Sequence, residues 1–485
     1  MYLGLDLGTS GLRGVLIEEA GTVIGSAEHE IATSYPRSGW SEQAPEDWID
    51  ACRAVIARIR AEHETEFSKL RGIGLSGHMH GATLLDADLN VLRPCIMWND
   101  TRAAQEAAKL DQITDMRAIS GNIVFPGFTA PKLEWVRTHE PDVYSRVAKV
   151  LLPKDYLRLW LTGECISDMS DSAGTSWLDV SSRTWSETAL RLSHMRLDQM
   201  PRLVEGSEVG GDLRSELRQD WGLTGPVVVA GGAGDNAAAA CGIGSVEDGA
   251  GFLSLGTSGV LLVARDRYAP KPETAVHCFC HAVPDRWIQM GVILSATNCM
   301  NWLSRNLRQS VGDLAGALPK SPEGPSAARF LPYLSGERTP HNDSAIRGAF
   351  LGLDVSSGPV DLTQAVMEGV GFAMRDCLEA LRSTGTEPSS LMAVGGGAQS
   401  QYWLETLATV LQIPLALPRG GEFGAAIGAA RLAICAASGA EPTDVMSPPE
   451  VGSIIEPRAD LFAAYEQAYQ SYRQYYAALA PLAQR

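Results

Sequence analysis

The pentapeptide Leu-Gly-Thr-Ser-Gly occurs twice, at residues 7–11 and again at 255–259, about half of the 485-residue chain apart. Apolar runs flank each copy, at residues 1–5 and 15–17 and at residues 252–254 and 260–263. An apolar run, a Gly-rich turn and a second apolar run predict a β-hairpin. Two matching hairpins half a chain apart predict two similarly built domains, which we place at residues 1–243 and 244–485.

The rest of the chain alternates strand-like and helix-like segments, which favours the α/β class. Short apolar runs predict strands at residues 72–76, 226–230 and 391–394. Helices are expected at residues 237–240, 424–436 and 458–480, and surface loops at the Pro-rich segments 318–325 and 447–457. The His-Cys-Phe-Cys-His run at 277–281 is expected to be a strand, because no second Cys/His pair lies nearby at zinc spacing.

The net charge of −17 disfavours nucleic acid and anionic lipid as partners, so an anionic ligand needs local backbone amides, helix N-termini or a metal ion. No apolar run reaches the length of a membrane span, and the N-terminus has no basic region typical of a secretory signal. Nine scattered cysteines indicate reduced thiols and a cytoplasmic location. The chain also lacks the P-loop, protein-kinase, dinucleotide-binding and nucleophile-elbow motifs.

Each Gly-Thr-Ser-Gly turn is suited to phosphate, because glycine allows close backbone approach and the two hydroxyls add donors. Glycine and serine also simply make hairpins, but two matched turns favour a polyphosphate held from both sides. The residues concerned are Thr9, Ser10, Gly256, Thr257 and Ser258.

Two carboxylates follow predicted strands. Asp6 ends the first strand, where it could anchor Mg²⁺ or cap the turn. Asp235 ends an apolar run, where it could be a general base for a hydroxyl that attacks a γ-phosphate or a helix N-cap. Met79 and His80, and likewise the segment 98–102, suit either a polar sugar site or an ordinary loop.

Together these residues resemble the FGGY family of carbohydrate kinases over essentially the whole chain. Two long signatures carry the resemblance, at residues 127–139 and 348–368, and further matching stretches lie at 76–86, 93–103, 153–164, 167–180, 231–244, 254–262 and 395–403. The resemblance implies two actin-like, ribonuclease-H-like ATPase domains that flank a deep catalytic cleft. The sugar would bind mainly to the first domain and ATP mainly to the second.

Carried over by motif, the resemblance makes Asp235 the catalytic base, with Asp6 and Asp235 as the carboxylates on the Mg²⁺ side. It implies a sugar pocket lined by Met79, His80, Asp235 and Asn236. Phosphates would meet the turns that contain Thr9, Ser10, Gly256, Thr257 and Ser258, and adenosine would face Gly396, Gly397 and Gln401.

The implied reaction is ATP-dependent phosphorylation of the terminal hydroxyl of D-xylulose, which gives D-xylulose 5-phosphate and ADP. Alternatives are another ketopentose or polyol, such as ribulose or glycerol, and a non-catalytic actin-like sugar sensor. Glycerol kinases of the family carry Arg-Glu where this chain has Met79-His80, which favours a ketose; many xylulose-specific members carry Gln in place of His78. The expected partners are the sugar and ATP, and a homodimer is left open.

Overall fold

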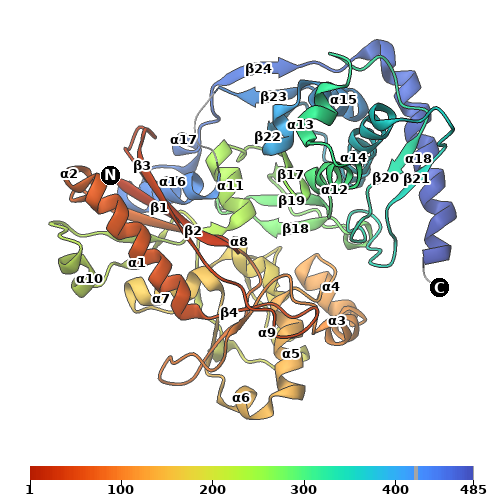
Figure 1. Cartoon of the computed structure of the whole chain (residues 1–485). Coiled ribbons are helices and arrows are strands. Elements are labelled where there is room, and N and C mark those ends of the chain that lie inside the picture. Colours follow the sequence, from red (N-terminus) through yellow and green to blue (C-terminus); the bar gives the residue numbers. More distant parts are fainter. Residues whose placement is uncertain (420–423, 484–485) are drawn as a thin grey trace.

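The computed structural model describes residues 1–419 and 424–483, and it contains two mixed seven-stranded sheets (Figure 1). The first sheet has the order β13-β14-β5-β1-β2-β3, with β15 paired to β5. Its strands are β1 (Tyr2–Leu7), β2 (Gly11–Ile17), β3 (Val23–Glu30), β5 (Gly72–Gly77), β13 (Val209–Asp212), β14 (Val228–Ala230) and β15 (Ala233–Gly234).

The second sheet has the order β18-β19-β17-β16-β22-β23-β24. Its strands are β16 (Gly251–Leu255), β17 (Gly259–Arg265), β18 (His277–Cys280), β19 (Trp287–Ile293), β22 (Leu391–Val394), β23 (Leu415–Pro418) and β24 (Val451–Ile455).

The two sheets repeat one plan. In the first, β1 and β2 form an antiparallel hairpin that β3 extends, while β5 runs parallel to β1 and β14 runs parallel to β5. In the second, β16 and β17 form the hairpin, β19 extends it, and β22 and β23 continue in parallel. The prediction of two similarly built α/β domains from the repeated pentapeptide is therefore confirmed.

Each sheet buries both faces, as its apolar strands predict. On β1, Leu3, Leu5 and Leu7 share a core with α1 (Pro45–Glu62) and α7 (Pro153–Thr162). The alternate residue Tyr2 joins a second core on the opposite face, because successive side chains of a strand point to opposite sides.

That second core is shared between the halves of the chain. It contains α11 (Asp235–Ile243), α16 (Ala425–Ser438) and inward residues of both sheets, including Phe252 of β16 (Figure 1). A Cβ on Gly74 of β5 would lie 1.7 Å from the carbonyl oxygen of Ala429, so only glycine permits this approach of α16. The division that we place between 243 and 244 falls at the end of α11 and stays a prediction, since α16 from the second half packs on the first sheet.

A smaller lobe is inserted in the first half between β5 and β13. It contains β6 (Thr83–Leu85), β7 (Cys95–Ile96), β8 (Lys149–Leu151), β9 (Ile166–Asp168), β10 (Leu178–Asp179), β11 (Thr184–Trp185), β12 (Arg202–Val204), α3 (Ala104–Asp111), α4 (Thr114–Ser120), α5 (Thr129–His139), α6 (Pro141–Arg146), α7, α8 (Met169–Ser172) and α9 (Glu187–Leu192). The first half also has β4 (Glu42–Gln43), which pairs with β7 of this lobe, and two short helices outside it, α2 (Glu64–Phe67) and α10 (Ser215–Asp220).

Helices of the second half cover the outer face of its sheet. They are α12 (Thr297–Leu307), α13 (Val311–Gly316), α14 (Pro359–Arg382) and α15 (Gln401–Leu411). Farther out, α18 (Phe462–Ala483) packs with the small sheet of β20 (Arg329–Leu331) and β21 (Ala349–Leu351), while α17 (Pro442–Val445) packs on α16. No helix in the described ranges is both long and apolar enough to cross a membrane.

One prediction of a loop was wrong. Residues 447–457 contain β24, which pairs antiparallel with β23 at the edge of the second sheet. Four of its five residues are exposed, so the segment lacks the apolar alternation of a half-buried strand. The strand prediction for the Cys/His run is confirmed, because residues 277–280 form β18.

Candidate functional site

The first Gly-Thr-Ser-Gly turn closes through a hydrogen bond from Gly8 N to Gly11 O of 2.9 Å. Ser10 is exposed, and the hydroxyl oxygen of half-buried Thr9 accepts a hydrogen bond from Trp98 Nε1 at 2.9 Å. Because that contact uses an acceptor lone pair, the hydroxyl hydrogen of Thr9 is still free to donate to a ligand.

The second turn leaves Thr257 and Ser258 exposed, while the carbonyl of Gly256 accepts hydrogen bonds from the amide and the hydroxyl of Thr297. Thr297 begins α12, so the turn is fastened to a helix N-terminus. Both turns thus present hydroxyls at hairpin tips, as their sequences predict.

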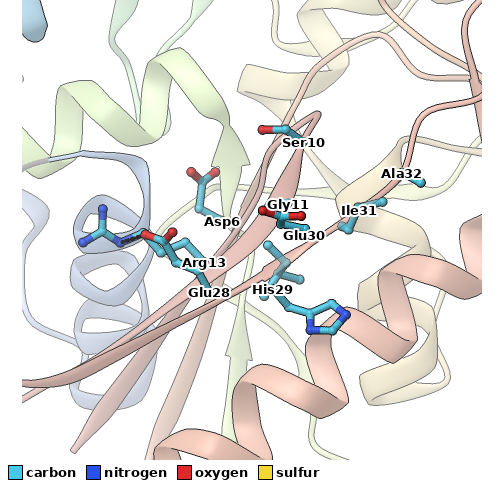
Figure 2. Close-up of a pocket in the computed structure, with 10 residues that line it drawn as sticks. Asp6, Ser10, Gly11, Arg13, Glu28, His29, Glu30, Ile31 and Ala32 are labelled. Carbon is cyan, nitrogen blue, oxygen red and sulfur yellow. Dashed lines mark ion pairs between the residues drawn. The ribbon is translucent and has the colours of Figure 1, made fainter.

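Asp6 lies directly behind the first turn. Its carboxylate accepts a hydrogen bond from Ser76 Oγ at 2.9 Å, and it faces Arg13 across the β1–β2 pair. Burial raises the pKa of Asp6, while the bond from Ser76 and the charge of Arg13 oppose that shift. Figure 2 shows Asp6, Ser10 and Arg13 around a cavity of about 900 Å³, with Arg13 directed to Glu28.

Asp235 is the first residue of α11, and its Oδ1 accepts hydrogen bonds from Asn236 N and Asn236 Nδ2, both at 2.7 Å. It does not cap α11, because the N-cap residue is Gly234. Burial, followed by the negative charge of Asp6, raises the pKa of Asp235 to about 7. A carboxyl with this pKa is suited to proton transfer near neutral pH.

The effect of Asp6 on Asp235 also bears on Mg²⁺. Two largely buried carboxylates that repel one another form an oxygen-rich site whose electrostatic cost a divalent cation relieves. Asp6 and Asp235 therefore fit Mg²⁺ by charge and by ligand type.

Met79 lies against Gly234, which precedes Asp235, and His80 lies against Gly174. A Cβ on Gly234 would come 3.0 Å from Met79 Sδ, and a Cβ on Gly174 would come 2.4 Å from the ring of His80. Small residues at these two positions therefore make room for both side chains.

The tautomer of His80 follows from its surroundings. Its Nδ1 lies 2.7 Å from Gly174 O, and since a carbonyl can only accept, Nδ1 carries the hydrogen. Burial lowers the pKa of His80 to about 3, so the ring is neutral. Its Nε2 is consequently an acceptor, able to receive a hydrogen bond from a substrate hydroxyl.

His78 points elsewhere. It is buried, its ring meets Trp48 edge-on at 5.9 Å, and burial lowers its pKa to about 3. Trp48 donates to Gln43 Oε1, and Gln43 Nε2 donates to Thr9 O at 2.6 Å. His78 thus packs behind the first turn.

Gly396, Gly397 and Gln401 line a third feature, a cavity of about 620 Å³ between α12, α13, α14 and α15. Apolar Met300 and Met367 line it together with the backbone of the Gly-rich segment. Thr297 also lines this cavity and binds Gly256, so the cavity adjoins the second turn. A flat heteroaromatic base suits such a pocket.

Gly396→Val should raise the KM for ATP at least ~10-fold in steady-state assays, with little change in the KM for the sugar. A bulkier side chain in the nucleotide pocket should weaken ATP binding by about that factor. A Cβ at Gly396 meets no atom within 4 Å, so the fold should tolerate it. Gly397→Val is the contrast: its Cβ would lie 2.8 Å from Leu255 Cβ, and it should lower stability instead. An unchanged ATP KM in Gly396→Val would remove this cavity as the nucleotide site.

Sequence reasoning missed a buried charged cluster that supports Asp235. Lys154 Nζ lies 2.5 Å from Asp155, 2.7 Å from Asp168 and 3.3 Å from Asp171, with all four side chains fully buried. Burial alone lowers the pKa of Lys154, but the three carboxylates outweigh it and raise that pKa. The ammonium therefore occupies the place that these carboxylates could offer a metal ion.

The cluster reaches the segment that precedes Asp235 through two residues, Ser170 and Arg158. Ser170 Oγ donates to Asp168 Oδ1 at 2.5 Å and accepts from Gly234 N at 3.2 Å, directly before Asp235. Arg158, also buried, donates to Ala230 O at 2.5 Å and to Gly231 O. Nothing in the sequence separates these charges from those of an exposed helix, because burial comes from tertiary packing.

The fold and these features define a two-domain carbohydrate kinase. The N-terminal domain of the FGGY family of carbohydrate kinases matches residues 1–242, and its C-terminal domain matches residues 251–437. The chain belongs to this family, which confirms the resemblance and the expected two-domain fold.

Relatives of the chain include a xylulose kinase from Escherichia coli (strain K12), 46% identical over 99% of this chain and 100% of the relative. A solved structure described as a xyloylose kinase from Brucella ovis is 58% identical and has a TM-score of 0.98. The match covers 99% of each of the two chains. A xylulose kinase structure from Rhodospirillum rubrum is 30% identical with a TM-score of 0.92, and each chain is covered completely.

Proposed function

We propose that this enzyme transfers the γ-phosphoryl group of ATP to the terminal hydroxyl of D-xylulose. The observation that carries the chemistry is Asp235, whose pKa is raised to about 7 by burial and by the charge of Asp6. The substrate rests on the relatives, since a full-length relative 46% identical is a xylulose kinase.

In this mechanism Asp235 accepts the proton of the terminal hydroxyl as that oxygen attacks the γ-phosphorus, and ADP leaves. The hydroxyls of Thr9, Ser10, Thr257 and Ser258 donate to phosphate oxygens from two sides. Gly396, Gly397 and Gln401 hold adenosine. Mg²⁺ held by Asp6 and Asp235 would supply positive charge against the phosphates.

The sugar lies against Met79 and Asn236, and His80 Nε2 accepts a hydrogen bond from one of its hydroxyls. We place the reaction in the cytoplasm, where the nine cysteines, all free thiols, would stay reduced. The proposed small-molecule partners are the sugar and ATP.

A coupled assay of ADP release over about a dozen ketoses and polyols tests the function. We expect kcat/KM to fall in the order D-xylulose, D-ribulose, glycerol, because glycerol lacks most of the hydrogen-bonding groups and leaves buried partners unpaired. First place for ribulose or a polyol would contradict the proposed acceptor, and no turnover with any acceptor would favour the sugar sensor.

His80→Ala should reduce the ratio of kcat/KM between D-xylulose and glycerol by ~10-fold or more, because it removes an acceptor for a sugar hydroxyl. His194→Ala is the matched control, because His194 lies at the surface against Glu134 Oε1 at 2.8 Å. If His80→Ala and His194→Ala have the same ratio of kcat/KM between D-xylulose and glycerol, His80 does not bind a sugar hydroxyl.

A further inference from the structure

Arg338 lies in the long connection between β20 and β21 and faces a cavity of about 530 Å³ that both halves of the chain line. Trp98 and Phe125 contribute from the first half, and Leu294 contributes with Arg338 from the second. The guanidinium carbon lies 4.9 Å from the centre of the Phe125 ring. Arg338 Nη1 is 3.5 Å from His277 Nε2.

Arg338 lies next in the chain to the carboxylate of Glu337. Burial lowers the pKa of the guanidinium, and the charge of Glu337 opposes that shift. In residues 1–419 and 424–483, no carboxylate forms an ion pair with Arg338. The neighbouring Glu337 carboxylate instead accepts hydrogen bonds from the amides of Leu294 and Arg338. A half-buried guanidinium without an ion pair keeps N–H donors that an oxygen-bearing ligand in the cavity would satisfy.

The surroundings of Arg338 connect it to the sugar pocket. The ring of His80 stacks on Phe128 at 4.5 Å, and Phe128 meets Phe125 at 5.5 Å. The charge of Arg338 contributes to the lowered pKa values of His80 and His277, after burial in both. Through these ring contacts, Arg338 lies on the His80 side of the pocket.

We propose that Arg338 is a specificity-determining residue that binds the end of the sugar remote from the phosphorylated hydroxyl. In a 2-ketose this end carries the C2 carbonyl and the C1 hydroxyl, and the proposal rests on the proposed function. A ketone oxygen can only accept, so it needs a donor, and the guanidinium presents parallel N–H groups that match two adjacent oxygens. His80 Nε2 supplies the complementary acceptor.

This assignment gives a role to the Cys/His run of the second half. His277 opens that run on β18, and its Nε2 and the face of Phe125 hold the guanidinium on two sides. Residues from both halves of the chain would then bind the acceptor sugar, with the base at one end of the sugar and Arg338 at the other.

The test compares D-xylulose with 1-deoxy-D-xylulose, which lacks the C1 hydroxyl, and with xylitol, in which a hydroxyl replaces the carbonyl. In the wild type kcat/KM should be highest for D-xylulose. Arg338→Met should raise the D-xylulose KM ~10–100-fold with a smaller change in kcat, as expected for lost hydrogen bonds to a charged group. The ratio between D-xylulose and each analogue should shrink to about twofold.

Arg338→Lys keeps the charge but loses the parallel donors, so its KM for D-xylulose should lie between those of the wild type and Arg338→Met. This variant also provides the test if Arg338→Met folds poorly. Arg347→Met is the matched control, because exposed Arg347 binds only carbonyls of its own loop, at Ser344, Ala345 and Ile346. If the wild type is active and both Arg338 variants keep its kcat/KM ratios between D-xylulose and the analogues, the role of Arg338 is overturned and the proposed function stands. A wild type inactive on D-xylulose would overturn the proposed function and this inference with it.

Discussion

Asp235→Asn should lower kcat by ~10²–10⁴-fold, because the amide keeps the size of the side chain but cannot accept the hydroxyl proton. The fold should survive, since the hydrogen bonds of Asp235 go to Asn236 and not to the core. Steady-state kinetics with D-xylulose, and calorimetry of ATP binding, separate lost turnover from lost binding. Asp198→Asn, at an exposed pair with Arg196, is the matched control.

The pH profile adds a second readout. The pKa of Asp235 is about 7, so the carboxylate holds its proton below that pH and cannot act as a base. We expect kcat/KM of the wild type to fall as pH drops below 7, and the residual activity of Asp235→Asn to lack this limb. Activity within threefold of the wild type in a folded variant would show that Asp235 is not the base.

The same raised pKa predicts the direction of a stability change. The folded state holds a proton on Asp235 between the ordinary carboxyl pKa and about 7, so this group favours folding at low pH and loses that contribution as pH rises through 7. Asp235→Asn removes the buried charge, and its thermal midpoint should exceed that of the wild type by a larger margin at pH 8 than at pH 5.

Local patterns predicted the parts of the fold that depend on neighbouring residues. The repeated pentapeptide indicated both hairpins, and β5 (Gly72–Gly77) and β22 (Leu391–Val394) lie where apolar runs place them. The position of α16 on the first sheet was not predictable, because it depends on Gly74 and Ala429, which are far apart in the sequence. The exposed edge strand β24 was missed because it lacks an alternating pattern.

In the candidate site as well, residues set by local sequence were predictable and residues set by long-range contacts were not. The hydroxyls of Thr9 and Thr257 and the carboxylates of Asp6 and Asp235 follow strands and turns, and so they could be identified from local order. The contact of Trp98 with Thr9 and the approach of Arg338 to Phe125 arise only when distant segments meet. Their side chains carry no periodic signal that separates them from surface residues.

Lys154→Met should be the most destabilising change outside the apolar cores. It leaves the carboxylates of Asp155, Asp168 and Asp171 buried without their shared cation, and breaking a buried ion pair from one side costs ~3–5 kcal/mol. The chain around Gly234 should loosen as well, because Ser170 links Asp168 to its amide. We therefore expect a lower urea midpoint and, in the folded fraction, a lower kcat.

Asp171→Asn is the matched variant that isolates the charge. The amide keeps the shape of the side chain and removes one buried negative charge. Because burial raises the pKa of Asp171 well above its ordinary value, this substitution should cost less stability than Lys154→Met. In Lys154→Met the buried carboxyls have no cation beside them when they ionise, so the stability deficit should grow from pH 5 to pH 8. Adding Asp171→Asn to Lys154→Met should recover part of the loss. Equal losses in the two single variants, or a deficit independent of pH, would mean that packing and not charge holds this cluster together.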